Sequence, residues 1–128
     1  MKINIKATGI ELTQAISDYV YKKISSIEKY LDKKSSPNII AQVEVGRSTR
    51  HHKTGNIFRA EVHITGASLD LYAVSEMADL YAAIDVVKDE IVHNIVQLKG
   101  KRETLARRGA KMMKRMIKGI TDSFWKGS

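Results

Sequence analysis

The chain has 128 residues, of which 43% are hydrophobic and 28% charged, a composition that suits one globular domain with its own core. It contains no cysteine, which excludes a disulfide scaffold, a thiolate zinc site and a cysteine nucleophile. Its longest apolar run covers residues 80–84, far fewer than the roughly 18 residues that cross a bilayer. No apolar segment typical of a signal peptide follows Met1, so we expect a cytoplasmic protein.

The formal net charge of +8 is concentrated at one end of the chain. Residues 1–98 contain twelve basic and twelve acidic side chains, whereas residues 99–128 contain ten basic and two acidic ones. A neutral domain followed by a basic segment is typical of proteins that bind polyanions. A basic tail that only aids solubility is the alternative interpretation.

The first part of the chain predicts a strand followed by a helix. Apolar and polar residues alternate over residues 2–7, as in a strand with one buried face. Gly9 interrupts this pattern, and Thr13 is a suitable N-cap for a helix that ends near the Ser-Ser-Pro sequence at 35–37. The predicted buried face of this helix consists of Ile16, Val20, Ile24, Ile27 and Leu31.

Three more strands and a second helix are predicted in the next part of the chain. Alternating apolar residues place strands at 39–45, 58–64 and 69–73, each with one apolar face. Ser75 is the expected N-cap of the second helix, with Glu76 and Asp79 in its first turn. The apolar face of this helix consists of Leu80, Ile84, Val87, Ile91, Ile95 and Leu98.

These elements predict an α+β fold of the order β-α-β-β-β-α, in which two long helices pack on one face of a four-stranded sheet. The helical crossover implies that the first two strands are parallel, and the short turns imply that the later strands pair antiparallel. We expect residues 1–102 to form the folded domain and residues 103–128 to form a basic amphipathic extension.

No constellation typical of an enzyme occurs in the sequence. The four histidines lack the H-x-x-x-H and H-E-x-x-H spacings of zinc sites. The sequence also lacks a G-x-S-x-G motif, a Walker-type loop and a dinucleotide-binding glycine pattern. Helix-surface and first-turn positions account for the carboxylates of residues 79–90. We therefore expect no catalysis, no metal and no cofactor.

A loop at residues 47–55 is a candidate for phosphate contact. It carries Arg47, Arg50 and Lys53 together with His51 and His52, and it contains no acidic residue. Lys and Arg side chains gain affinity for nucleic acids by releasing the counterions condensed on phosphates. A solvated loop that keeps one end of the sheet soluble is the alternative interpretation.

The extension at 103–128 predicts an amphipathic helix. Its apolar residues recur at helical spacing, at Leu105, Met112, Met116, Ile120 and Phe124, and basic residues occupy much of the remaining surface. Such a helix can lie on RNA, on an anionic membrane or on an acidic protein partner. Periodicity does not choose among these three partners.

Several segments resemble one protein family when taken together. The sequence Asp-Leu-Tyr-Ala-Ala-Ile-Asp at 79–85 resembles the start of the second helix of ribosome hibernation-promoting factors, also called ribosomal subunit interface proteins. The first helix and the segment at 50–62 are also similar to that family. The resemblance covers about residues 1–102. It implies the fold predicted above and a non-catalytic protein that binds the small ribosomal subunit in the channel of messenger and transfer RNA.

The resemblance further implies that basic residues on the exposed helix faces contact the 16S ribosomal RNA backbone, near the neighbouring ribosomal proteins. Lys23, Lys29, Lys99 and Lys101 match this pattern. Together with the charge pattern, the candidate RNA-binding residues are Lys22, Lys23, Lys29, Arg47, Arg50, His52, Lys53, Arg59, Lys88, His93, Lys99, Lys101, Arg102, Arg107, Arg108 and Lys111. No small-molecule substrate and no membrane are expected in this interpretation.

The sequence departs from the family pattern on both helices. Ser26 on the first helix, and Glu90, His93 and Gln97 on the second, occupy positions that are often basic in the family. We therefore expect phosphate attraction to shift toward the segments 47–53 and 99–118. A module that binds a membrane surface or an acidic protein through the basic tail, and a partner protein that modulates transcription, are the alternative functions.

Overall fold

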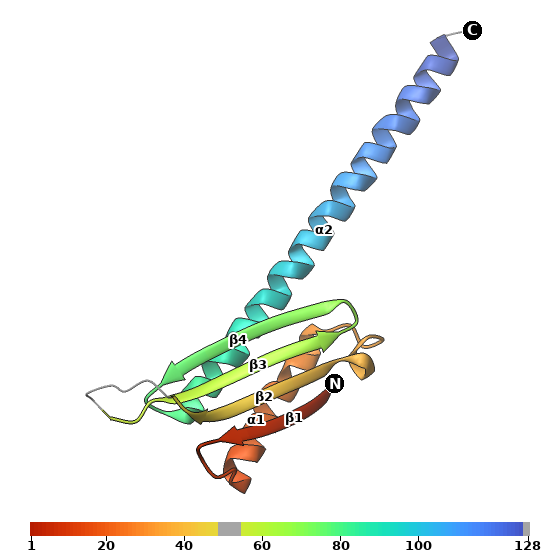
Figure 1. Ribbon diagram of the computed structural model, residues 1–128. Coiled ribbons are helices and arrows are strands. Elements are labelled where there is room, and N and C mark those ends of the chain that lie inside the picture. The colour runs from red at the N-terminus through yellow and green to blue at the C-terminus, as the bar shows by residue number, and fades with distance from the viewer. Residues whose placement is uncertain (49–54, 127–128) are drawn as a thin grey trace. The chain divides into compact units, whose positions relative to one another are not determined.

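The computed structural model describes residues 1–48 and 55–126, with the side chains of 102–106 and 110–126 left undescribed. Its elements, shown in Figure 1, are the strands β1 (Lys2–Thr8), β2 (Ile40–Arg47), β3 (Phe58–Gly66) and β4 (Leu69–Met77), the helices α1 (Gln14–Ser25) and α2 (Leu80–Lys126), and the 3₁₀ helices η1 (Ser26–Tyr30) and η2 (Ser36–Asn38). The chain divides into two compact units, Met1–Ile95 and Val96–Ser128. The predicted α+β order is confirmed. The predicted division at residue 102 remains a prediction.

The four strands form one sheet in the order β1-β2-β3-β4. β1 pairs parallel with β2, with Ile3 opposite Ala41, as the intervening helical crossover requires. β2 with β3 and β3 with β4 are antiparallel pairs. Figure 1 shows α1 and the first turns of α2 on one face of this sheet, which leaves the other face open within the first unit.

The first helix is shorter than its apolar periodicity predicts. Thr13 caps it as expected, because its Oγ1 accepts a hydrogen bond from the backbone N–H of Ile16 at 3.2 Å. The α-helix ends at Ser25, however, and continues as η1. The hydroxyls of Ser25 and Ser26 donate back to the carbonyls three residues earlier, a local bond that competes with regular helical pairing.

The start of the second helix also differs from the prediction. Ser75 and Glu76 are not at a helix N-terminus but in β4, where they pair with Ala60 and Arg59. β4 pairs with β3 along its full length and therefore continues beyond residue 73, where the sequence predicts its end. Strand pairing thus overrides the local capping signal. Asp79 occupies the cap position instead: its carboxylate accepts from the N–H of Tyr81 at 3.1 Å, and its carbonyl accepts from Ala83 at 3.1 Å.

The core lies between the sheet and the helices. Its buried residues come from the predicted faces of α1, η1, β2, β3 and α2, and include Val20, Ile24, Ile27, Val43, Val45, Val62, Ile64, Ile84, Val87 and Ile91. Among the described side chains of α2, Ile95 is the last buried one, and Leu98 is half-buried. No polar or charged side chain in the described part of the chain is buried. In the same residues no helix is long and apolar enough to cross a membrane.

Candidate nucleic-acid interface

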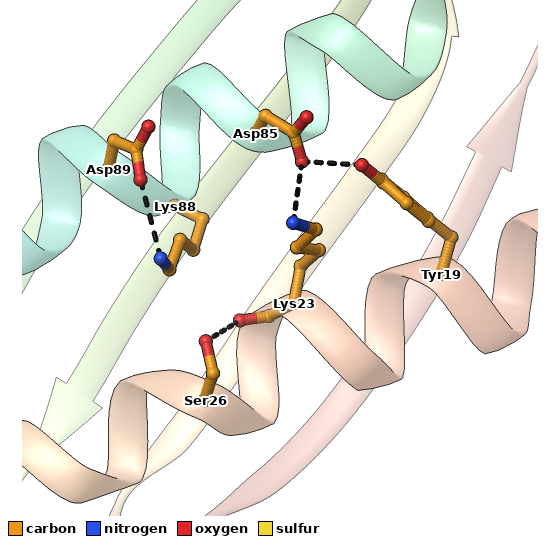
Figure 2. A network of polar contacts seen from close by, with 6 residues as sticks. All are labelled: Tyr19, Lys23, Ser26, Asp85, Lys88 and Asp89. Atoms are coloured by element: carbon orange, nitrogen blue, oxygen red, sulfur yellow. Dashed lines mark hydrogen bonds and ion pairs between the residues drawn. The ribbon is translucent and has the colours of Figure 1, made fainter.

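Side chains of α1 and α2 meet in a polar network on the helix layer, which Figure 2 shows from close by. We call the six labelled residues the inter-helix network: Tyr19, Lys23, Ser26, Asp85, Lys88 and Asp89. The Tyr19 hydroxyl donates to Asp85 Oδ1 at 2.6 Å, and Lys23 Nζ lies 3.5 Å from the same oxygen. These two contacts join residues that are more than 60 positions apart in the sequence, so the fold alone creates them.

The phenol of Tyr19 is held in its protonated form. Its hydrogen bond to Asp85, together with partial burial and the negative charge of that carboxylate, raises the pKa of Tyr19 from 10.0 to about 12. The ring also packs edge-on against Tyr81, with centroids 4.8 Å apart. Lys23 Nζ lies 5.5 Å from the centroid of the Tyr19 ring, within reach of a cation–π contact.

Lys88 is the second lysine of the inter-helix network. Its Nζ lies 3.3 Å from Asp89 Oδ1, and three-quarters of its side chain is shielded from solvent. The Ser26 hydroxyl donates to the Lys23 carbonyl at 2.5 Å. Both lysines that the network brings together are therefore paired with a carboxylate of α2.

The helix layer as a whole carries no excess of positive charge. Residues 14–30 contain three lysines and two carboxylates, and residues 80–95 contain one lysine and three carboxylates. Acidic side chains thus outnumber basic ones by one on the surface where the family resemblance places RNA contacts. This balance agrees with the expectation that phosphate attraction is concentrated elsewhere in the chain.

The remaining candidates on the helices are accessible to a polyanion. Lys22, Lys29 and His93 are exposed, and no ion pair links them to another residue in the described part of the chain. Lys29 Nζ lies 6.0 Å from the centroid of the Tyr30 ring. Lys22 and Lys29 are therefore the cations of α1 and η1 that a phosphate can reach without displacing a carboxylate.

The open sheet face ends in a polar pocket of about 220 Å³ beside the loop that follows β2. It is lined by Thr8, Glu44, Gly46, Arg47, Ser48, Arg59 and Glu76. Arg59 lies 2.7 Å from Glu61; burial lowers the pKa of Arg59, but the hydrogen bond and charge of Glu61 outweigh it and raise that pKa overall. Arg47 is exposed and lacks a carboxylate partner among the described residues.

Tyr72 stands on the open face, with half of its surface exposed. Its hydroxyl lies 3.5 Å from Arg59, and its ring meets His63 edge-on. His63 in turn contacts Asp70 at 2.6 Å. Apart from Tyr72, no Phe, Tyr or Trp ring is exposed on the described part of this face, and the His63 ring is held edge-on to Tyr72 and in contact with Asp70.

The other candidates belong to the two basic segments. Arg50, His52 and Lys53 lie outside the described residues. In α2, Lys99, Lys101, Arg107 and Arg108 are exposed, whereas the side chains of Arg102 and Lys111 are not among those described. The extension is helical through Lys126, as the continuation of α2. No group of three or more His, Asp or Glu side chains that could hold a metal occurs in the described chain.

Sequence reasoning did not single out Tyr19 and Asp85 as interacting residues. Tyr19 lies beside Val20 of the predicted buried face, and Asp85 lies beside Ile84, so both flank the apolar stripes of their helices. Helical periodicity predicts such flanking positions but not which of them meet, because it contains no information on helix packing.

Comparison with known proteins assigns the fold to a family. Residues 3–103 match the family described as Sigma 54 modulation protein / S30EA ribosomal protein, and the chain belongs to this family. The resemblance found in the sequence is therefore confirmed. The match includes α1 and, apart from Lys2, all four strands, and it ends within α2.

Named relatives and solved structures agree with this assignment. The ribosome hibernation promoting factor of Azotobacter vinelandii is 32% identical over 102 residues, which cover 80% of this chain and 86% of that protein. The protein of the same name from Pseudomonas putida is 30% identical over 105 residues, covering 82% and 93%. The N-terminal domain of Thermus thermophilus Protein Y superposes with a TM-score of 0.64 at 28% identity, covering 77% of this chain and 99% of that one. A ribosomal subunit interface protein from Coxiella burnetii, 14% identical with a TM-score of 0.60, shares the fold.

Proposed function

We propose that the protein is a ribosome hibernation factor that binds the small ribosomal subunit in the channel for messenger and transfer RNA. It inhibits translation there by steric blockade and performs no catalysis. The observation that carries this proposal is the family match over residues 3–103, which spans the whole sheet and the helices packed on it. The relatives that align over 102 and 105 residues of this chain are named ribosome hibernation promoting factors.

The distribution of accessible cations supports RNA as the partner. Lys22, Lys29 and Arg47 in the first unit, and Lys99, Lys101, Arg107 and Arg108 in the second, are exposed and form no ion pair with another described residue. Such side chains can neutralise phosphates without first breaking an ion pair within the protein. The counterions released from the RNA therefore contribute fully to affinity. The 16S ribosomal RNA backbone is the polyanion that this proposal assigns to them.

A direct test combines purified 30S subunits with labelled messenger RNA and transfer RNA. Adding the protein should abolish binding of both RNAs, and the loss should be complete at one protein molecule per subunit, because a blockade requires one occupant for each channel. The protein should sediment with the 30S subunits in the same samples. Loss of RNA binding at a small fraction of the subunit concentration would indicate turnover and contradict steric blockade.

The alternative partner is tested with the same protein preparation. Vesicles that contain anionic phospholipids present negative charge to the basic tail without any RNA. We expect weak retention on these vesicles that disappears when 30S subunits compete. Vesicle binding that 30S subunits do not displace, combined with no sedimentation with 30S particles, would instead favour a membrane-surface module.

A further inference from the structure

The carboxylate of Asp85 has a central place in the inter-helix network. Its Oδ1 lies 2.6 Å from the Tyr19 hydroxyl and 3.5 Å from Lys23 Nζ, and both partners come from α1 (Figure 2). The hydrogen bond from Tyr19 fixes the position of the carboxylate, and the aromatic ring of the same tyrosine lies near the lysine. Asp85 therefore presents a negative charge to Lys23 at a defined place on the helix layer.

The ion pair between Lys23 and Asp85 remains open to solvent. The side chain of Lys23 is 34% exposed and that of Asp85 is 42% exposed. Ion pairs with this exposure and a distance of 3.5 Å add little to folding stability, because water and salt screen them. A phosphate that approaches the helix layer can consequently compete for the ammonium group of Lys23.

Other lysines of the same layer are placed differently. Lys22 and Lys29 are exposed, and neither forms an ion pair with a described residue. Lys23 points across to α2 and meets Asp85, as Figure 2 shows. When a phosphate binds Lys22 or Lys29, the release of its counterions contributes fully to the binding free energy. At Lys23 the phosphate must first displace the Asp85 carboxylate, whose negative charge also repels it.

We propose that Asp85 is an affinity-restraining residue of the RNA contact surface, which competes with RNA phosphates for Lys23. This inference rests on the proposed function, since it assigns a role within the surface that binds RNA. The competing carboxylate lowers the affinity of the protein for any RNA. Selectivity then comes from contacts that only the correct binding site on the ribosome can make. Lys23 thus contributes to binding only when a phosphate displaces Asp85.

The test measures binding to single-stranded poly(U) and to 30S subunits across a salt series. Asp85→Asn removes the charge and keeps an oxygen that accepts the Tyr19 hydrogen bond. We expect poly(U) affinity to rise several-fold at low salt, and the slope of log K against log salt to steepen by up to about 0.7, the value for one added phosphate contact on a single strand. In a Lys23→Gln background the same substitution should lose this gain.

Two controls separate this competition from other effects. Glu11→Gln removes an equal charge from an exposed position outside the inter-helix network and should change the salt slope much less. Tyr19→Phe keeps the Asp85 charge but removes the hydrogen bond that positions it, so it should change the salt slope less than Asp85→Asn does. A thermal melt checks that each variant is folded. The Asp85 side-chain carboxyl ¹³C signal of the unmodified protein should also shift as poly(U) is added, a measurement that needs no variant.

The outcomes distinguish this inference from the function on which it rests. Failure of the unmodified protein to bind 30S subunits would overturn the proposed function, while the poly(U) series would still test the competition. Poly(U) affinity that does not rise in Asp85→Asn, or that rises equally with Lys23 replaced by Gln, would overturn the role of Asp85. An unmoved carboxyl signal at saturating poly(U) would overturn it as well.

Discussion

At the scale of residues, the environment of each candidate cation separates side chains that the sequence cannot distinguish. Lys22 and Lys23 are neighbours with the same formal charge, yet Lys22 is exposed whereas Lys23 meets Asp85. Lys88 is paired in the same way with Asp89. Counting basic residues therefore overestimates the number of lysines on the helix layer that are free of a carboxylate partner among the described residues.

The raised pKa of Tyr19 predicts a pH dependence of stability. The folded protein holds the phenol protonated up to a pKa of about 12, whereas the unfolded chain releases that proton near the ordinary value of 10.0. The stabilisation is therefore complete below pH 10 and declines as the pH rises from 10 to 12. Chemical denaturation of the unmodified protein and of Tyr19→Phe should show a stability difference that shrinks over this interval. A difference that is constant from pH 8 to pH 12 would contradict the assigned hydrogen bond.

At the scale of elements, two boundaries differ from those predicted from the sequence, one because of strand pairing and one because of local serine hydrogen bonds. β4 continues through Ser75 to Met77 because β3 offers a partner for every residue of this stretch. α1 gives way to η1 at Ser26, where serine hydroxyls bond to the preceding turn. In both places the buried residues are those that the apolar spacing predicts. The core is therefore the expected one, although the ends of the elements differ.

The position of the α2 cap predicts which polar residue stabilises this helix. Asp79→Ala removes the acceptor for the N–H of Tyr81 and should lower the free energy of unfolding by about 1 kcal/mol. Asp79→Asn retains a capping oxygen and should cost much less by the same principle. Urea denaturation of the two variants and of Ser75→Ala provides the comparison. A larger loss for Ser75→Ala than for Asp79→Ala would favour the cap originally predicted at Ser75.

At the scale of the whole molecule, structure and charge are divided along the chain. The first unit contains the sheet and its core, and the residues from 99 onward carry the entire net charge of +8. Since the family match ends at residue 103, most of this basic segment lies beyond the region shared with the family. Most of the net positive charge therefore lies outside the part of the chain that contains the sheet and its core.

Truncation after residue 102 tests this division. The shortened protein should remain folded, because it retains the whole sheet and every residue of the described core, the last of which on α2 is Ile95. Its affinity for 30S subunits should fall, and if four phosphate contacts are lost, the slope of log K against log salt should flatten by roughly three units. Charge reversal of Lys23 and Lys29 should have a smaller effect, since Lys23 is already paired with Asp85. Unchanged affinity and slope in the truncated protein would show that the helix faces carry the binding.

The sequence alone was sufficient to predict the order of the elements, the parallel and antiparallel pairing, and the buried faces of the helices. Alternation with period two and apolar spacing near 3.6 are local properties, and they survive whatever the elements pack against. The uneven charge and the family resemblance were likewise visible in the chain itself.

Only the tertiary structure decided which side chains meet across elements. The contacts of Asp85 with Tyr19 and Lys23 depend on helix packing, and the extension of β4 along β3 depends on strand register. The contact of Lys23 with Asp85 decides that this lysine, unlike Lys22, has a carboxylate partner. Local sequence patterns cannot predict such a contact between two helices. The physical reason is that periodicity fixes the face on which a residue lies, whereas packing fixes what stands opposite that face.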